Sequence, residues 1–161
     1  MGSSMHAELP AWPSRPPPLT EGPVHTWNLS KTAELAGLRS DVRRRLDQGP
    51  TSFPDHRAAS ERLLLAVEEL TSNALRHGEL PVTTTITIGD TGWLVVVTDS
   101  AVDRPPFQDI DRDPAQGGLG LKLVGMLSSA HGWVTEDSRK QVWAFVPHQP
   151  GDPLPEDSTD A

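Results

Sequence analysis

Two polar side chains one helical turn apart are the first candidates for chemistry in this sequence. Glu69 and Asn73 lie four residues apart within the largely apolar run from Leu63 to His77. Because a helix repeats every 3.6 residues, both side chains project from one face. A carboxylate there can accept a proton from a hydroxyl or water, and an amide oxygen is a suitable Mg²⁺ ligand. A solvated helix face is the alternative interpretation of the same pattern.

Asp99 and a glycine cluster add two further polar sites. Asp99 follows a hydrophobic strand pattern, and its carboxylate can accept a hydrogen bond from an exocyclic amine such as that of adenine. Gly117, Gly118 and Gly120 precede an apolar helical pattern, and a glycine-rich loop that opens a helix offers free backbone N–H groups to phosphate. The alternatives are an Asp that caps the next turn and glycines that only form a turn.

Two better-known phosphate-binding motifs do not fit these glycines. A P-loop needs a Gly-Lys-Ser/Thr sequence, and none is present. A dinucleotide-binding fingerprint follows a strand, whereas these glycines follow the proline-rich segment 100–116. That segment is long for a compact domain, and loops of this length are often lids or binding loops.

Helical and strand patterns alternate along the first half of the chain and must position these groups. The expected elements are a strand at Val24–Leu29, a helix capped by Ser30 and ended by Gly49-Pro50, and a second helix capped by Asp55 that runs to His77 and stops at Gly78.

The second half of the chain predicts a hairpin, a helix and two final strands. These elements are strands at 82–88 and 93–98, a helix at 119–130, and strands at 133–136 and 141–146 joined by the turn 137–140. The order predicts an α+β two-layer sandwich. We expect a mixed, largely antiparallel sheet with about three helices on one face.

Both ends of the chain are rich in proline and poor in apolar residues. We therefore expect a disordered proline-rich arm at residues 1–23, one domain at residues 24–147, and a disordered acidic tail at residues 148–161.

Composition excludes several classes of protein. The net charge of −8 argues against direct nucleic-acid binding, which depends on Lys and Arg. Without cysteine there are neither disulfides nor thiolate zinc sites. No apolar run approaches the roughly 20 residues of a membrane span, and the N-terminus lacks the apolar core of a signal peptide. We expect a soluble, cytoplasmic protein with no membrane contact.

The polar sites together resemble the motifs of a known superfamily. The set Glu69-x-x-x-Asn73-Ala74-x-x-His77, then Asp99, then Gly117-Gly118-Leu119-Gly120-Leu121 resembles the N-box, G1 box and G2 box of the GHKL ATPases, which share the Bergerat fold. The resemblance covers about residues 24–147. The short length and the ending Val142-Trp143-Ala144-Phe145-Val146 resemble the anti-sigma factor serine/threonine kinase branch, of RsbW and SpoIIAB type.

The resemblance implies ATP and Mg²⁺ as cofactors and a role for each motif residue. Glu69 would be the general base, Asn73 the Mg²⁺ ligand, and Asp99 the reader of the adenine amino group. Gly117, Gly118 and Gly120, with the amides of Leu119 and Leu121, would hold the phosphates, and residues 100–116 would form a lid. His77 matches a common residue at the end of the N-box, with helix-end packing or capping as the alternative.

The resemblance also implies a function and partners. The chain would transfer the γ-phosphate of ATP to an anti-anti-sigma (STAS-domain) protein and thereby switch the sequestration of a sigma factor, and it would form a homodimer. The alternative is a non-catalytic binding module that sequesters a regulatory partner with or without nucleotide. Ser100-Ala101-Val102-Asp103 in place of glycines, and Gln141 in place of an expected Thr, favour the module, whereas the Glu69/Asn73 pair favours the enzyme.

Overall fold

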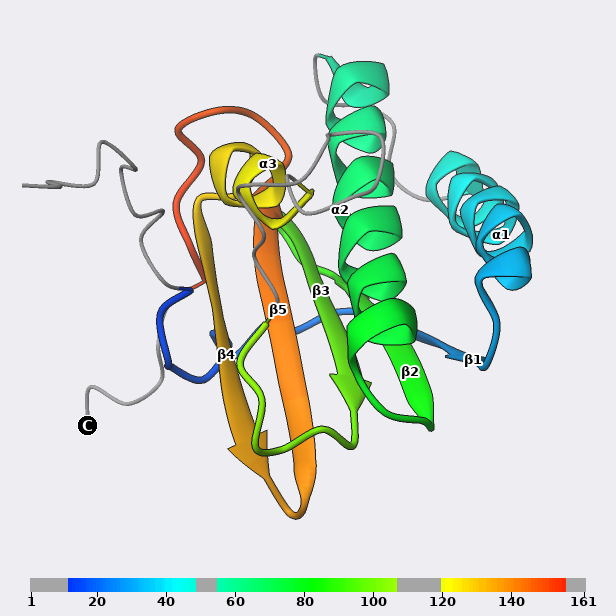
Figure 1. Cartoon of the computed structure of the whole chain (residues 1–161). Coiled ribbons are helices and arrows are strands. Elements are labelled where there is room, and N and C mark those ends of the chain that lie inside the picture. The colour runs from blue at the N-terminus through cyan, green and yellow to red at the C-terminus, as the bar shows by residue number, and fades with distance from the viewer. Residues whose placement is uncertain (1–11, 49–54, 107–119, 156–161) are drawn as a thin grey trace, which may run out of the picture.

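The structure, a computed structural model, describes residues 12–48, 55–106 and 120–155 (Figure 1). Its elements in chain order are β1 (Val24–Leu29), the 3₁₀ turn η1 (Thr32–Glu34), α1 (Leu35–Gln48), α2 (His56–His77), β2 (Val82–Ile88), β3 (Gly92–Asp99), α3 (Gly120–Leu127), β4 (Ala130–Glu136) and β5 (Arg139–Pro147). None of the helices in these described ranges combines the length and the apolar character that a membrane span requires.

Five strands form one sheet in the order β1-β2-β3-β5-β4, and each neighbouring pair is antiparallel. All three helices lie on one side of this sheet (Figure 1). We call the side that the helices cover the inner face and the opposite side the outer face. The predicted α+β two-layer sandwich is confirmed, with a sheet that is antiparallel in all of its strand pairs.

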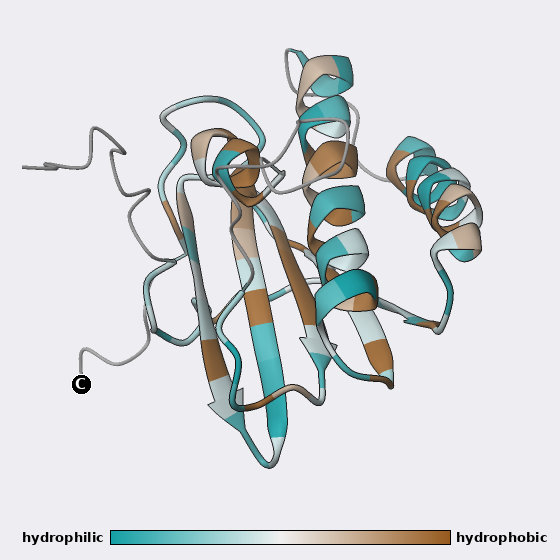
Figure 2. Cartoon of the chain, in the orientation of Figure 1, coloured by the Kyte–Doolittle hydropathy of each residue, from teal (hydrophilic) through white to brown (hydrophobic). Residues whose placement is uncertain are grey.

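Helix α2 forms the centre of the core because its apolar residues recur at helical spacing. Leu63, Ala66, Val67, Leu70 and Ala74 are all buried along one stripe of this helix. The stripe packs against the inner face, where α2 contacts β2, β3 and β5. Brown segments of the strands lie behind α2 in Figure 2, in keeping with this packing.

A buried hydrogen bond fixes α2 relative to the sheet. The hydroxyls of Thr71 on α2 and Thr84 on β2 lie 2.8 Å apart, and neither side chain is exposed. One hydroxyl donates to the other, so each of the two buried oxygens has a hydrogen-bond partner. The pair holds the C-terminal half of α2, between Glu69 and Asn73, at a defined place above β2.

Strand alternation decides which β3 and β5 side chains meet the helices. Val95 and Val97 of β3 face inward, and Asp99, two residues further on, therefore faces inward as well. Leu94 and Trp143 face outward and belong to a second, smaller apolar cluster. The candidate base-reading residue thus lies on the helix-covered side of the sheet.

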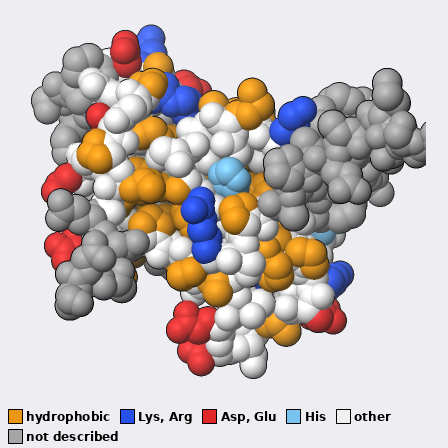
Figure 3. All heavy atoms as spheres, turned by 90° about the vertical axis from the view of Figure 1, so that its left-hand side faces the viewer, with side chains coloured by type: hydrophobic (Ala, Val, Ile, Leu, Met, Phe, Trp, Pro, Cys, Tyr) orange, Lys and Arg blue, Asp and Glu red, His pale blue; other side chains and the backbone are white. Residues whose placement is uncertain are grey.

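Residues 12–23 run along β4 and the outer face. Trp133 on β4 donates its backbone N–H to Pro13 and accepts from the N–H of Arg15, both at 3.0 Å, and its indole donates to Trp12. The indole of Trp143 donates to the Arg15 carbonyl at 2.9 Å. Figure 3 looks onto this side of the molecule and shows hydrophobic side chains gathered there, with basic and histidine side chains among them.

These contacts differ from the expected disorder of the whole arm 1–23. Trp12 is only 5% exposed and joins the main apolar cluster, which gives the arm an anchor that its proline content conceals. The segment also satisfies backbone groups on the edge strand β4 that would otherwise be unpaired. Residues 1–11 lie outside the described residues.

The helix ends differ in detail from the expectation. The hydroxyl of Ser30 does not cap the first helix; instead the Glu34 carboxylate accepts from the backbone N–H groups of Ser30 and Lys31. Asp55 precedes α2 in a left-handed conformation, and its side chain makes no capping hydrogen bond. Helix α3 ends at Leu127 rather than at residue 130, because Ala130 already pairs with Phe145 in the sheet.

The segment after β5 also has contacts to the domain. The backbone N–H of His148 donates to Thr91 at 2.9 Å, and its ring lies edge-on to Trp93 with centroids 4.5 Å apart. The described part of the expected disordered tail 148–161 therefore begins as a packed continuation of β5. Residues 156–161 lie outside the described residues.

Trp12→Ala tests whether the arm belongs to the fold. Because the indole is buried, we expect its removal to lower the free energy of unfolding by about 3 kcal/mol. Urea denaturation followed by tryptophan fluorescence and circular dichroism measures the change. Leu19→Ala is the control, since Leu19 lies in the same arm but is 60% exposed. Equal stability of the two variants would show that the arm adds nothing to the domain.

Candidate functional site

Glu69 lies against the start of α3. A Cβ added at Gly120 would collide with the Oε2 atom of Glu69, so the absence of a side chain at Gly120 is what lets the carboxylate approach. Asn73 follows one turn later on α2. The structure therefore brings the helix that carries Glu69 and Asn73 next to the last glycine of the Gly117–Gly120 cluster.

Burial and a like-charged neighbour make Glu69 a stronger base than a free carboxylate. Its pKa is raised above the ordinary value, first because burial disfavours the charged form and second because the Glu68 carboxylate is next to it. Arg76, nearly two turns further along α2, lowers the pKa and opposes part of this effect. Glu68 itself forms an ion pair with Arg39 on α1.

Asp99 is buried at the end of β3 with one oxygen bonded and one not. The Oδ1 atom accepts the backbone N–H of Ala101 at 2.7 Å, so Asp99 caps the following turn. The Oδ2 atom is buried without a hydrogen bond, although the ammonium of Lys140 lies 3.4 Å away. Oδ1 therefore caps the following turn, as the alternative interpretation of Asp99 predicts, and Oδ2 remains available as a hydrogen-bond acceptor.

Gly78 closes the other side of the Asp99 carboxylate. A Cβ at Gly78 would lie 2.6 Å from Cγ of Asp99 and 2.7 Å from the carbonyl oxygen of Ala74. The φ angle of Gly78 is −91°, a value open to any residue, so conformational freedom does not explain the glycine. Close approach of β3 to the end of α2 explains it, and the sequence interpretation of Gly78 as a simple helix stop missed this contact.

Strand register places Lys140, not Gln141, beside Asp99. Lys140 pairs directly with Asp99 across β3 and β5, and both side chains face inward. Gln141 pairs with Thr98 and therefore faces outward, on the opposite side of the sheet. Gln141, the residue found in place of an expected Thr, therefore does not lie beside the Asp99 carboxylate. Lys140 does, although it is not part of the motifs.

The remaining motif residues are described only in part. Gly117, Gly118 and Leu119, and the lid residues 107–116, lie outside the described residues. Leu121 is the second described residue of α3, and its side chain is buried. His77 is the last residue of α2. Within the described part of the segment expected to form a lid, Arg104 forms an ion pair with Glu79 at 3.0 Å.

The residues present fit a nucleotide better than a metal held by protein groups alone. The unbonded Oδ2 of Asp99 is a buried acceptor suited to an amino group, and Gly120 lets the Glu69 carboxylate lie against the start of α3. No cluster of three or more His, Asp or Glu side chains capable of holding a metal occurs in the described ranges. The resemblance assigns Asn73 to Mg²⁺, an ion that commonly takes one or two protein ligands together with phosphate oxygens.

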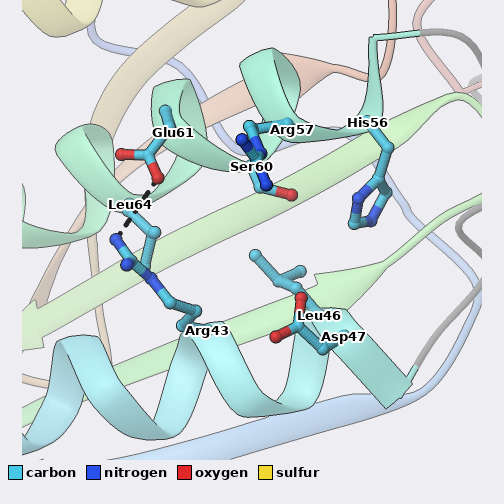
Figure 4. Close-up of a pocket in the computed structure, with 8 residues that line it drawn as sticks. All are labelled: Arg43, Leu46, Asp47, His56, Arg57, Ser60, Glu61 and Leu64. Carbon is cyan, nitrogen blue, oxygen red and sulfur yellow. Dashed lines mark hydrogen bonds and ion pairs between the residues drawn. The ribbon is translucent and has the colours of Figure 1, made fainter.

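A separate hollow of about 500 Å³ lies between α1 and the first half of α2. Figure 4 shows Arg43 and Glu61 paired across it, with His56 and Asp47 also at its wall. Its lining mixes both signs of charge and includes neither Glu69 nor Asp99. This hollow is distinct from the motif residues.

Gly78→Ala tests the close packing of α2 on Asp99. The added methyl group meets backbone and a buried carboxylate, neither of which can move freely, so we expect a loss of about 1 to 3 kcal/mol in unfolding free energy. Gly37→Ala on α1 is the matched control. A Cβ there has no neighbour within 4 Å, and the change should stabilise the helix by roughly 0.5 to 1 kcal/mol. Two variants of equal stability would contradict the packing.

Glu69→Gln tests the raised pKa through the pH dependence of stability. The folded state holds the Glu69 proton more tightly than the unfolded chain, so the wild type loses stability as pH rises from the ordinary to the raised pKa. The Gln variant lacks this loss and should gain stability relative to the wild type over the pH range that starts at the ordinary carboxyl pKa, about 4, and extends upward. Urea unfolding across that range measures the difference, with the exposed Glu136→Gln as control. A constant difference would contradict the raised pKa.

Comparison with known protein families agrees with the site geometry. The model of the histidine kinase-like ATPase domain matches residues 31–145, which is more than half of the chain. The match includes α2, the end of β3 and the start of α3, the three elements that carry the motif residues. Among curated proteins, none matches the sequence. On the strength of the family match and the fold, this chain belongs to the family of histidine kinase-like ATPase domains.

Proposed function

We propose that this domain binds Mg²⁺-ATP and acts as a serine/threonine protein kinase of the anti-sigma factor type. The observation that carries the proposal is the position of the Glu69 carboxylate against Gly120, where the glycine cluster enters α3. A general base and a phosphate-binding segment must lie side by side for phosphoryl transfer. Two elements distant in the sequence supply them here.

The residues of the chain take separate parts in this function. The Oδ2 atom of Asp99 accepts from the amino group of the base, and the first amides of α3, including that of Leu121, offer donors to phosphate. Asn73 supplies an oxygen to Mg²⁺, which neutralises phosphate charge when bound. Glu69, with its raised pKa, accepts the proton of an attacking hydroxyl.

The proposed phosphate acceptor is a hydroxyl on an anti-anti-sigma (STAS-domain) partner, and its phosphorylation would switch sequestration of a sigma factor. This part of the proposal rests on the resemblance of the motifs and of the β5 ending to the anti-sigma branch. A homodimer is part of the same proposal. A non-catalytic module that binds nucleotide and sequesters the partner is the competing function, and it differs only in whether Glu69 has a hydroxyl to activate.

Calorimetric titration with Mg²⁺-ATP tests the binding step. We expect binding by the wild type, loss of the Mg²⁺-dependent part in Asn73→Ala, and wild-type behaviour in Asn28→Ala on β1. Because the amide oxygen of Asn73 is a proposed ligand of the ion, Asn73→Ala should weaken ATP binding at least tenfold when Mg²⁺ is present. The same substitution should have little effect on ATP binding in EDTA. No heat of binding at millimolar ATP would remove the proposed function altogether.

Transfer of label from γ-labelled ATP to a purified STAS-domain protein of the same organism tests catalysis. Glu69→Gln should abolish labelling and leave ATP binding intact, because it removes the base but keeps the shape. Glu61→Gln is the matched control, since Glu61 lies about two turns earlier on the same helix and pairs with Arg43 on α1. Labelling that persists in Glu69→Gln excludes Glu69 as the base. ATP binding without any labelled partner would favour the module.

A further inference from the structure

Lys140 is a buried cation at the position where the nucleotide base is expected. It is 3% exposed and Asp99 is 1% exposed, and the register of β3 and β5 sets the two side by side on the inner face. In Figure 2, the part of β5 nearest the β4–β5 turn is coloured as hydrophilic, in contrast to the rest of that strand. Within this hydrophilic end Lys140 is the residue that faces inward, and its burial calls for an explanation.

A stabilising role does not account for the burial of the Lys140–Asp99 ion pair. Removing two charges from water is costly, and a buried ion pair offsets that cost only with good geometry and further hydrogen bonds. Here Oδ2 of Asp99 lies 3.4 Å from the ammonium and makes no hydrogen bond. A buried acceptor that makes no hydrogen bond lowers stability, and a donor on a bound molecule would remove that cost.

Adenine presents the complementary pattern on adjacent atoms. Its exocyclic amino group at C6 donates, and the neighbouring ring nitrogen N1 accepts. The protein has the complementary groups side by side: Oδ2 of Asp99 can accept from the amino group, and the Lys140 ammonium can donate to N1. An ammonium has three protons, so Lys140 can form its ion pair with Asp99 and still donate to a ligand.

We propose that Lys140 is a base-reading residue that donates a hydrogen bond to N1 of adenine while Asp99 accepts from the amino group. The inference rests on the proposed ATP binding and adds the residue that determines the specificity for the base. Guanine reverses the pattern, with an acceptor at C6 and a donor at N1. It would set a carbonyl oxygen against the carboxylate and an N–H against the ammonium, so the pair discriminates against GTP.

Binding of ATP analogues to the full chain tests the inference without any mutation. The probes are the Mg²⁺ complexes of ATP, of 1-deaza-ATP, which lacks only the N1 acceptor, and of GTP, titrated by calorimetry. Because a hydrogen bond to a charged donor is lost, we expect the wild type to bind 1-deaza-ATP at least tenfold more weakly than ATP. GTP should bind more weakly still.

Lys140→Met provides the second arm and Gln141→Met its control. The Met variant should lose at least tenfold in ATP affinity and should no longer distinguish ATP from 1-deaza-ATP, because the donor is gone. Gln141→Met alters the adjacent residue on the outer face and should behave as the wild type. Circular dichroism shows whether each variant is folded. If Lys140→Met does not fold, the comparison of ATP with 1-deaza-ATP on the wild type still tests the inference.

The outcomes separate this inference from the function on which it rests. Equal affinities of the wild type for ATP and 1-deaza-ATP would overturn the role of Lys140 and leave ATP binding in place. Loss of ATP binding in Gln141→Met equal to that in Lys140→Met would also overturn it. Failure of the wild type to bind ATP at all would overturn both proposals.

Discussion

The packing of α2 across the inner face of the sheet is the contact on which the rest of the structure depends. One stripe of this helix supplies much of the main core, and the buried pair Thr71–Thr84 fixes its position above β2. The same helix carries Glu69 and Asn73 on its remaining surface. Because the apolar stripe determines how the helix is rotated about its axis, burial of the core also aims these two polar residues. Stability and site geometry therefore have a common origin.

Glycines set how closely the other elements approach α2. Gly120 allows α3 to begin against the Glu69 carboxylate, and Gly78 allows the end of β3 to reach the last turn of α2. In both places a methyl group would fill space next to a carboxylate. The glycines therefore bring backbone and acidic side chains together from three elements, and neither is explained by a left-handed backbone conformation.

The polar groups at this meeting point are costly to bury. Glu69 has a raised pKa because it is partly removed from water, and Asp99 keeps an unbonded oxygen beside a buried lysine. Such groups lower the stability of the free protein, and the apolar contacts elsewhere must offset them. Part of that compensation comes from outside the expected domain boundaries, because Trp12 packs into the main cluster and His148 packs against Trp93.

The sequence by itself determined the fold class, the order of the elements and the residues of the motifs. Period-2 and period-3.6 patterns are local, and β1 and β2 have the bounds that they predict. The proline-rich arm shows where local patterns fail, since its anchor is a single tryptophan whose burial depends on β4. Tertiary structure alone decided which residue stands beside Asp99. A shift of one residue in register moves a side chain to the other face of a sheet, and only the pairing of β3 with β5 assigns Lys140 inward and Gln141 outward.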